Sequence, residues 1–160
     1  MPITANDTTR KSWLEVLSDS DFPIQHIPFG VFLTKENIVT VGTRIGDFAI
    51  DLGALQQLNY FEGIELTDDM FMQDTLNDFI SDGQKTWRLV RNRIAEIFDA
   101  ANPELRDNTK HRDIVIFKME DVEMQLPVLI GDYTDFYSSR EHATNVGKMF
   151  RDPENALLPN

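Results

Sequence analysis

Cysteine is absent from this chain of 160 residues. The absence excludes disulfide bonds, thiolate catalysis and zinc sites with cysteine ligands, so any metal ion must be bound by oxygen or imidazole. Long apolar runs are missing as well. None approaches the roughly 20 residues that cross a bilayer, and the amino terminus has no basic segment followed by an apolar one. These absences predict a cytoplasmic protein with no membrane association.

Positive charge is also scarce, because 15 lysines and arginines stand against 27 aspartates and glutamates and the net charge is −12. A field of that sign repels nucleic acids and anionic lipid surfaces, so neither is an expected partner. Hydrophobic residues make up 41% of the chain. That content allows one ordinary core, or one small domain with part of another.

Short apolar or β-branched runs separated by turn residues predict antiparallel strands. The first three runs form a meander, and the last two are expected to return to the same sheet. The predicted strands are 30–34, 38–45, 48–52, 114–117 and 122–126. Between the second and third, Gly46-Asp47 suits a two-residue type II′ hairpin with glycine in the first position.

Helical patterns occupy the middle of the chain. Thr75 and Asp78 have the spacing of a cap pair and predict a short helix, while an apolar stripe over 84–101 predicts a longer one that Pro103 ends. Ser12 and Glu15 have the spacing of a capping box, which predicts a further short helix near the amino terminus. Two prolines predict an extended segment over 19–28.

The segment 131–151 reads GDYTDFYSSREHATNVGKMFR and is the richest in chemically useful side chains. Ser138 and Glu141 have capping-box spacing, which places the helix start at Ser139 and leaves the residues up to Tyr137 in the preceding loop. Tyr137 and His142 then occupy the two positions of a hydrophobic staple, so their rings should be neighbours. The positive end of the helix dipole disfavours a charged imidazole, and a neutral His142 can act as a base.

Arg151 follows His142 by nine positions, so on an unbroken helix the two side chains would point to opposite sides. A shared site requires Arg151 to lie beyond the helix end, and Pro153 indicates an end by Asp152. A purely structural interpretation stays open for this cluster. In it Asp135 bonds loop amides in an Asx turn, Tyr137 is a core aromatic with a wet edge, His142 is a satisfied surface residue and Arg151 is a solvated charge. The other two histidines, His26 and His111, are expected to be ordinary exposed residues in an extended segment and a polar loop.

The sequence nevertheless resembles a known family. The run 131–147 and the following MFRDPENALLPN to Asn160 are similar to fumarylacetoacetases, as are 19–32 and 75–80. The resemblance implies an α+β protein: a small SH3-like β-barrel domain with helices, followed by the truncated start of a β-roll catalytic domain. The implied division is a flexible segment 1–18, the SH3-like domain 19–126 and the incomplete catalytic domain 127–160.

The resemblance also implies a function, because this family hydrolyses a carbon–carbon bond of 4-fumarylacetoacetate to fumarate and acetoacetate in tyrosine and phenylalanine breakdown. By its motif, Asp135 resembles a ligand of a divalent cation, Ca²⁺ or Mg²⁺. Tyr137 resembles a substrate-binding phenol, His142 the general base that activates water, and Arg151 a contact of a substrate carboxylate. The family is homodimeric, so self-association is expected.

The resemblance covers only the front portion of the family's length. Its remaining metal ligands include a Glu-x-Glu pair, and no such pair occurs in these 160 residues. One ligand is far from the six to eight oxygens that Ca²⁺ takes, so the chain by itself is expected to be inactive. The alternative function is a non-catalytic SH3-like module for oligomerisation or partner binding, marked by an exposed apolar patch on the barrel.

Overall fold

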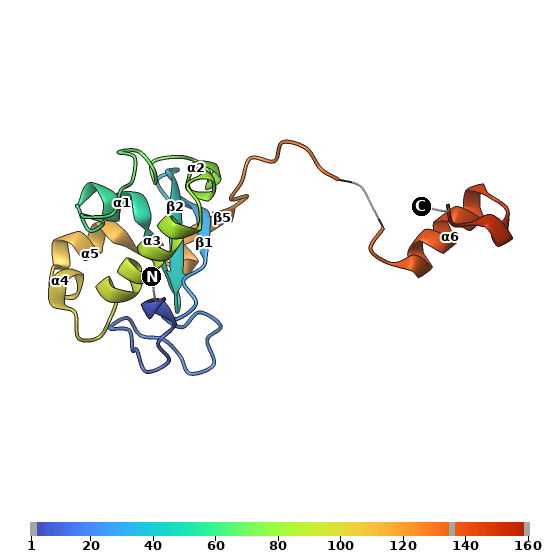
Figure 1. The fold of residues 1–160 in the computed structure, drawn as a ribbon. Helices are drawn as coiled ribbons and strands as arrows, with labels where there is room; N and C mark the ends of the chain where they lie inside the picture. Colours follow the sequence, from blue (N-terminus) through green and yellow to red (C-terminus); the bar gives the residue numbers. More distant parts are fainter. Residues whose placement is uncertain (1–2, 135–136, 159–160) are drawn as a thin grey trace. The chain divides into compact units, whose positions relative to one another are not determined.

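The computed structural model describes residues 3–134 and 137–158. Its contacts divide the chain into two compact units, Met1–Leu129 and Ile130–Asn160 (Figure 1). Among the described residues, no helix is both long and apolar enough to cross a membrane.

One antiparallel sheet organises the first unit. Its strand order is β4-β3-β2-β1-β5, and each strand is antiparallel to its neighbours. The strands are β1 (Phe29–Thr34), β2 (Val39–Ile45), β3 (Phe48–Asp51), β4 (Ile116–Lys118) and β5 (Val122–Gln125). All five predicted strands are confirmed, except that residues 114 and 115 end a helix instead of beginning β4.

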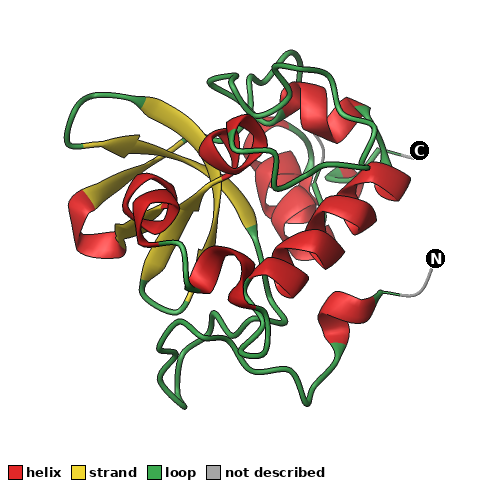
Figure 2. Ribbon diagram, turned by 90° about the vertical axis from the view of Figure 1, so that its left-hand side faces the viewer, coloured by secondary structure: helices red, strands yellow, loops and turns green. Residues whose placement is uncertain are grey.

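The sheet is curled into a half-barrel. Its edge strands, β4 and β5, are joined only by the 3₁₀ turn η2 (Met119–Asp121). In a flat sheet these edges would lie about 19 Å apart. The four peptide units from Lys118 to Val122 span at most about 14 Å. The sheet must therefore bend to bring its edges together, and Figure 2 shows the curled strands in yellow.

The predicted hairpin at Gly46-Asp47 is confirmed. Ile45 pairs with Phe48, so the loop has two residues, and Gly46 has φ of +56°. Asp47 is not among the described residues with positive φ, which distinguishes type II′ from type I′. Glycine is also required by space, because a Cβ at Gly46 would lie 2.8 Å from the carbonyl oxygen of Glu15.

In the part of this unit that the structure describes, five α-helices accompany the sheet. They are α1 (Leu52–Gln57), α2 (Asn77–Ser81), α3 (Gln84–Ile97), α4 (Pro103–Arg106) and α5 (Thr109–Val115). The two helices predicted in the middle of the chain are confirmed as α2 and α3. The predicted stripe of α3 is buried at Val90, Ile94 and Ile97, in one core with Val31 and Ile50 of the sheet.

Three predicted helix signals are wrong. The cap pair at Thr75 does not form, because α2 begins after Leu76, whose N–H donates to the carbonyl of Pro127 at 2.8 Å. Pro103 does not end α3, which stops at Ile97. Pro103 is instead the first residue of α4 and directly follows the cap residue Asn102. The missing N–H of proline costs nothing there, because the first N–H groups of a helix have no partner within the helix.

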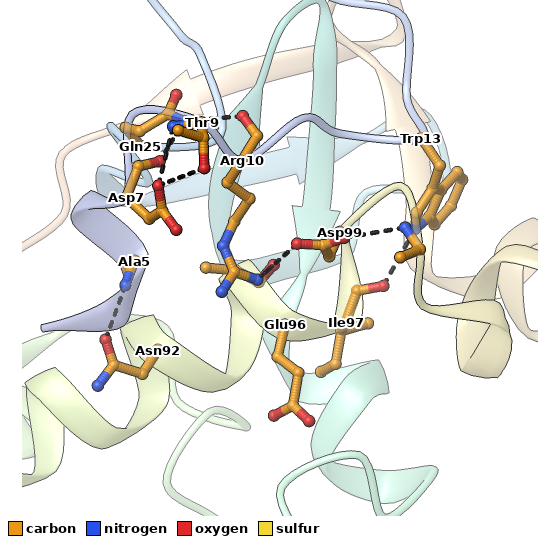
Figure 3. A network of polar contacts seen from close by, with 12 residues as sticks. Ala5, Asp7, Thr9, Arg10, Trp13, Gln25, Asn92, Glu96, Ile97 and Asp99 are labelled. Carbon is orange, nitrogen blue, oxygen red and sulfur yellow. Dashed lines mark hydrogen bonds and ion pairs between the residues drawn. The ribbon is translucent and has the colours of Figure 1, made fainter.

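The third error concerns Ser12–Glu15, which forms no helix. Ser12 instead forms a β-bridge with Asp99, and Trp13 stacks on Phe98 with ring centroids 5.2 Å apart. The carboxyl end of α3 explains this, because its last carbonyls need donors. The indole of Trp13 donates to Ile97 O at 3.0 Å, and Arg10 donates to Ala95 O at 2.8 Å (Figure 3).

The segment 19–28 is not wholly extended. A turn closes with the hydrogen bond from His26 N to Pro23 O at 2.8 Å, and Ile27 has φ of +44°. Positive φ is unfavourable for a β-branched residue. The side chains of Ile24 and Ile27 are both buried, and their burial offsets that cost.

The second unit contains α6 (Arg140–Phe150) and the 3₁₀ turn η3 (Pro153–Asn155). Its described part begins with residues 130–134, which have no regular secondary structure.

Asp51 links the sheet to its first helix. It ends β3, and its carboxylate caps α1 by accepting a hydrogen bond from Ala54 N at 2.8 Å. Burial raises the pKa of Asp51, although hydrogen bonds from Ala54, Thr40 and Gly53 oppose the shift. The folded state therefore binds this proton more tightly than the unfolded state does. Stability contributed by Asp51 is lost as pH rises from the ordinary value of 3.8 through the raised folded value.

Asp51→Asn keeps a good cap and removes the buried charge. We expect its free energy of unfolding to rise relative to the parent protein as pH increases from about 4 to 7. Asp51→Ala should show the same pH trend, offset by about 1 kcal/mol for the lost cap. Urea unfolding at several pH values measures both, with Asp113→Asn as an exposed control. A difference between Asp51→Asn and the parent that does not change with pH would contradict the raised pKa.

Candidate functional site

Helix α6 positions His142, and Ser139 fixes where this helix begins. The Ser139 hydroxyl accepts a hydrogen bond from His142 N at 3.2 Å and donates to a carboxylate oxygen of Glu141 at 3.0 Å. The predicted capping residue, Ser138, is therefore wrong by one position, and the helix starts at Arg140. Two consecutive serines offer the same cap chemistry, so composition does not decide between them.

The predicted contact between Tyr137 and His142 is confirmed. Their ring centroids lie 5.1 Å apart with an interplanar angle of 69°, an edge-on arrangement. The register differs from a staple, because Tyr137 precedes the cap by two residues and His142 is the third residue of the helix. Both rings are exposed. The phenol thus packs against one side of the imidazole, and the rest of the imidazole remains accessible to a ligand or to water.

Glu141 adds a negative charge next to this pair. Its own backbone N–H and the Ser139 hydroxyl lower the pKa of the Glu141 carboxyl. The group is thus a carboxylate at neutral pH, in the first turn of α6, where the helix dipole favours negative charge.

Arg151 lies beyond the helix end, as predicted. It is the C-cap of α6, with φ of −138° and ψ of 168°, and its N–H donates to Gly147 O at 2.9 Å. Its guanidinium donates to Ala156 O at 3.2 Å. The turn η3 folds this carbonyl back onto α6, where Gly147 and Ala156 are both buried. A Cβ at Gly147 would overlap the backbone of Ala156, so only glycine permits this approach.

The structure brings two of the four predicted site residues together. Asp135 lies outside the described residues. Among the described ones, no hydrogen bond or ion pair joins Arg151 to Tyr137 or His142. The last residue of α6, Phe150, follows His142 by eight helical positions, a rise of about 12 Å along the axis, and Arg151 comes after it.

The described residues do not by themselves supply a set of metal ligands. Within 3–134 and 137–158, no group of three or more histidine, aspartate or glutamate side chains is arranged to hold a metal ion. Calcium takes six to eight oxygen ligands, so the implied cation would need further ligands.

The remaining predicted histidines differ from each other. His26 is exposed as expected and stacks on Phe22. His111 lies in α5, not in a loop, and its Nδ1 is 2.9 Å from the hydroxyl of Tyr60. Burial raises the pKa of that phenol. His111 is therefore a structural partner of Tyr60.

Sequence reasoning missed two positions that shape this region, Gly147 and Ala156. The available signal was a glycine inside a predicted helix, followed a few residues later by Pro153. A conspicuous glycine in a helix often marks a close backbone approach.

Comparison with known proteins gives a consistent result. A family described as "Fumarylacetoacetase N-terminal" matches residues 25–127. The chain is 46% identical over 151 residues to the fumarylacetoacetase of Dictyostelium discoideum, covering 94% of this chain and 35% of that protein. It is 44% identical to those of Arabidopsis thaliana, over 94% of this chain, and Homo sapiens, over 93%, and covers 36% of each. The chain thus spans about a third of the length of these relatives.

Ser139→Ala should destabilise α6 by about 1 kcal/mol, because it removes the acceptor for His142 N. Ser138→Ala should have little effect, since the Ser138 side chain makes no cap hydrogen bond. Carbon-13 Cα chemical shifts over residues 140–150 measure the helix population in both variants. Equal losses in the two would contradict the observed cap.

Gly147→Ala should release the turn at 151–156 from α6, because the new methyl group overlaps Ala156. Hydrogen exchange at the Arg151 amide should accelerate and the Ala156 chemical shifts should change. Asn145→Ala, at an exposed position of the same helix, is the control and should preserve both signals. The result is diagnostic because replacing glycine by alanine otherwise favours a helix by about 1 kcal/mol. A stabilised helix with an intact turn would show that the close approach does not exist.

Proposed function

The chain belongs to the fumarylacetoacetase family, and from that premise we propose that it forms the amino-terminal third of an enzyme that hydrolyses 4-fumarylacetoacetate. The products are fumarate and acetoacetate. The observation that carries the proposal is the edge-on contact of Tyr137 with His142 at the start of α6, within a sequence 46% identical to a fumarylacetoacetase. The activity belongs to the complete protein, because the chain spans only 35% of that relative.

The domain organisation follows the same proposal. We assign the half-barrel unit to an SH3-like domain and the segment from about residue 127 to the start of a β-roll catalytic domain. The support is an α+β unit whose curled five-stranded sheet is closed by a 3₁₀ turn between its last two strands. The family match over 25–127 lies within this unit.

His142 is the proposed general base. A neutral imidazole takes a proton from water while the water oxygen attacks the carbonyl carbon of the fumaryl group. The carbon–carbon bond then breaks, which leaves fumarate and the enolate of acetoacetate. The enolate carbon takes a proton, returned by the imidazolium, and the base is regenerated. The contact with Tyr137 restricts rotation of the imidazole and keeps it oriented for both transfers.

The other residues have binding roles in this proposal. Tyr137 contacts the substrate through its exposed hydroxyl, and Arg151 pairs with a substrate carboxylate, for which a planar guanidinium is suited. Asp135 is proposed as one ligand of Ca²⁺ or Mg²⁺, with the other ligands outside these 160 residues. We also propose a cytoplasmic homodimer that binds neither nucleic acid nor membrane.

A non-catalytic module for oligomerisation or partner binding is the second candidate. The observation that favours it is the apolar surface near the edge strand β5, where Met124 and Leu126 are exposed. Exposed apolar patches of this kind mark interaction surfaces. Under this alternative the side chain of His142 has no chemical task.

A chimera separates the two functions. This chain is joined to the part of the Dictyostelium discoideum fumarylacetoacetase that follows the matched region. We expect fumarylacetoacetate hydrolysis by the chimera and none by the 160-residue chain alone. His142→Ala in the chimera should lower kcat by about 10²–10⁴-fold, the range for loss of a general base, with metal affinity nearly unchanged.

His26→Ala is the control for that variant, since it removes another exposed histidine and should leave kcat near the parental value. A folded but inactive parental chimera would contradict the proposed enzyme. Retention of near-parental kcat by His142→Ala would contradict the general-base role and favour the module.

A further inference from the structure

A groove of about 470 Å³ lies within the first unit, between β1, α2 and α3. We call it the α2–α3 groove; residues that line it include Phe29, Phe79, Ile80, Trp87, Arg88 and Arg91. Its volume falls in the range of pockets that bind small molecules, about 300–1,000 Å³. It contains none of the residues proposed for hydrolysis, so it requires a separate explanation.

The walls of the groove are apolar and held in place. Phe29 and Phe79 meet edge to face with centroids 4.8 Å apart. The indole N–H of Trp87 donates to the carbonyl of Phe79 at 2.6 Å, so its hydrogen-bonding capacity is already satisfied. Trp87 therefore offers the groove only its apolar ring surface, and the pocket suits a hydrocarbon or aromatic body.

Two guanidinium groups, those of Arg88 and Arg91, line the same groove, and neither has a carboxylate partner among the described residues. Arg91 is held by neutral acceptors, the side-chain oxygen of Asn6 at 2.6 Å and the carbonyls of Gln25 and His26. Arg91 is half-buried, and the loss of hydration on burial lowers the pKa of its guanidinium. Arg88 is half-buried, and its side chain makes no hydrogen bond or ion pair with any residue that the structure describes.

This lack of carboxylates is unusual in so acidic a chain. Acidic residues outnumber basic ones by 27 to 15, and six other lysines and arginines form ion pairs in the described regions. The α2–α3 groove is thus a local positive site beside an apolar cavity. An anion bound there would pair with Arg88 and offset the desolvation of Arg91.

We propose that the α2–α3 groove binds a small amphiphilic carboxylate, with its carboxylate on Arg88 and Arg91 and its apolar body against Phe29, Phe79 and Trp87. The long-range field of the protein repels anions, so binding depends on the local pairs and not on general attraction. The apolar body accounts for the rest of the affinity through burial.

Decanoate, below the concentration at which it forms micelles, is the probe, and decanol is its uncharged counterpart. Calorimetry of the 160-residue chain measures affinity, and the NMR signal of the Trp87 indole N–H reports the location. We expect decanoate to bind at least about tenfold more tightly than decanol. Arg88→Gln should remove about tenfold of the decanoate affinity and leave decanol unchanged, because it removes a charge-assisted hydrogen bond.

Two matched pairs of variants test the position. Lys85→Gln removes a charge from an exposed site of the same helix that does not line the groove, and should leave binding unchanged. Ile80→Glu places a carboxylate in the groove and should abolish decanoate binding, whereas Ile114→Glu on α5 should not. Ile80 and Ile114 are 47% and 51% exposed, so both changes should be tolerated by the fold, which thermal melts confirm for each variant.

Several results would overturn the proposal. One is equal binding of decanoate and decanol with no effect of Arg88→Gln, which would indicate an apolar pocket without an anion site. Another is loss of binding in Ile114→Glu as large as in Ile80→Glu, which would place the ligand elsewhere. The third is the absence of both heat and a Trp87 shift at millimolar decanoate.

Discussion

The short connection between β4 and β5 is the constraint on which the first unit depends. Three residues of η2 join strands at opposite edges of the sheet, so the sheet cannot be flat. Its curvature brings Phe32 against Gly42, where a Cβ would also lie 2.6 Å from the carbonyl of Ile50. A side chain at position 42 would therefore not fit into the curved sheet, and glycine is required there. The opposite face of the sheet contributes Val31 and Ile50 to the core shared with the helices.

The carboxyl end of α3 is the second organising feature, and it recruits the amino-terminal segment. Arg10 bridges Ala95 O and the carboxylate of Asp99 at 2.8 and 2.9 Å, and Ala5 N donates to the buried side chain of Asn92 at 3.1 Å (Figure 3). The bond from Arg10 satisfies Ala95 O, one of the carbonyls that the helix end leaves without a donor. The bonds from Arg10 and Ala5 also hold α3 at both its middle and its end, and α3 carries the arginines of the α2–α3 groove.

Features with a strong local cause were predictable from the sequence. The strands were readable from β-branched runs, the hairpin from Gly46, and α3 from its apolar stripe. Local helix signals of equal strength gave wrong predictions where other residues offered a competing hydrogen bond. Ser12 and Trp13 bond to the end of α3 and its following residues instead of forming a helix, and Asn102 caps a new helix that begins at Pro103. In the candidate site, the nearness of Tyr137 and His142 followed from the helix start, with an error of one residue in its position. The contact of Gly147 with Ala156 has no periodic signal, because it is an approach of two backbones.

The pairing of β1 with β5 has a consequence for how the chain folds. Val31 pairs with Gln125, so the first and last strands of the unit meet in one ladder, whereas β1, β2 and β3 pair with sequence neighbours. Closing a long loop costs entropy before the contact repays it, and such non-local pairs slow folding. During synthesis the meander can form early, but its β1 edge stays open until β5 has been made. Until β5 pairs with it, the open edge of β1 is a transient site for aggregation. This exposure recurs each time the protein is synthesised.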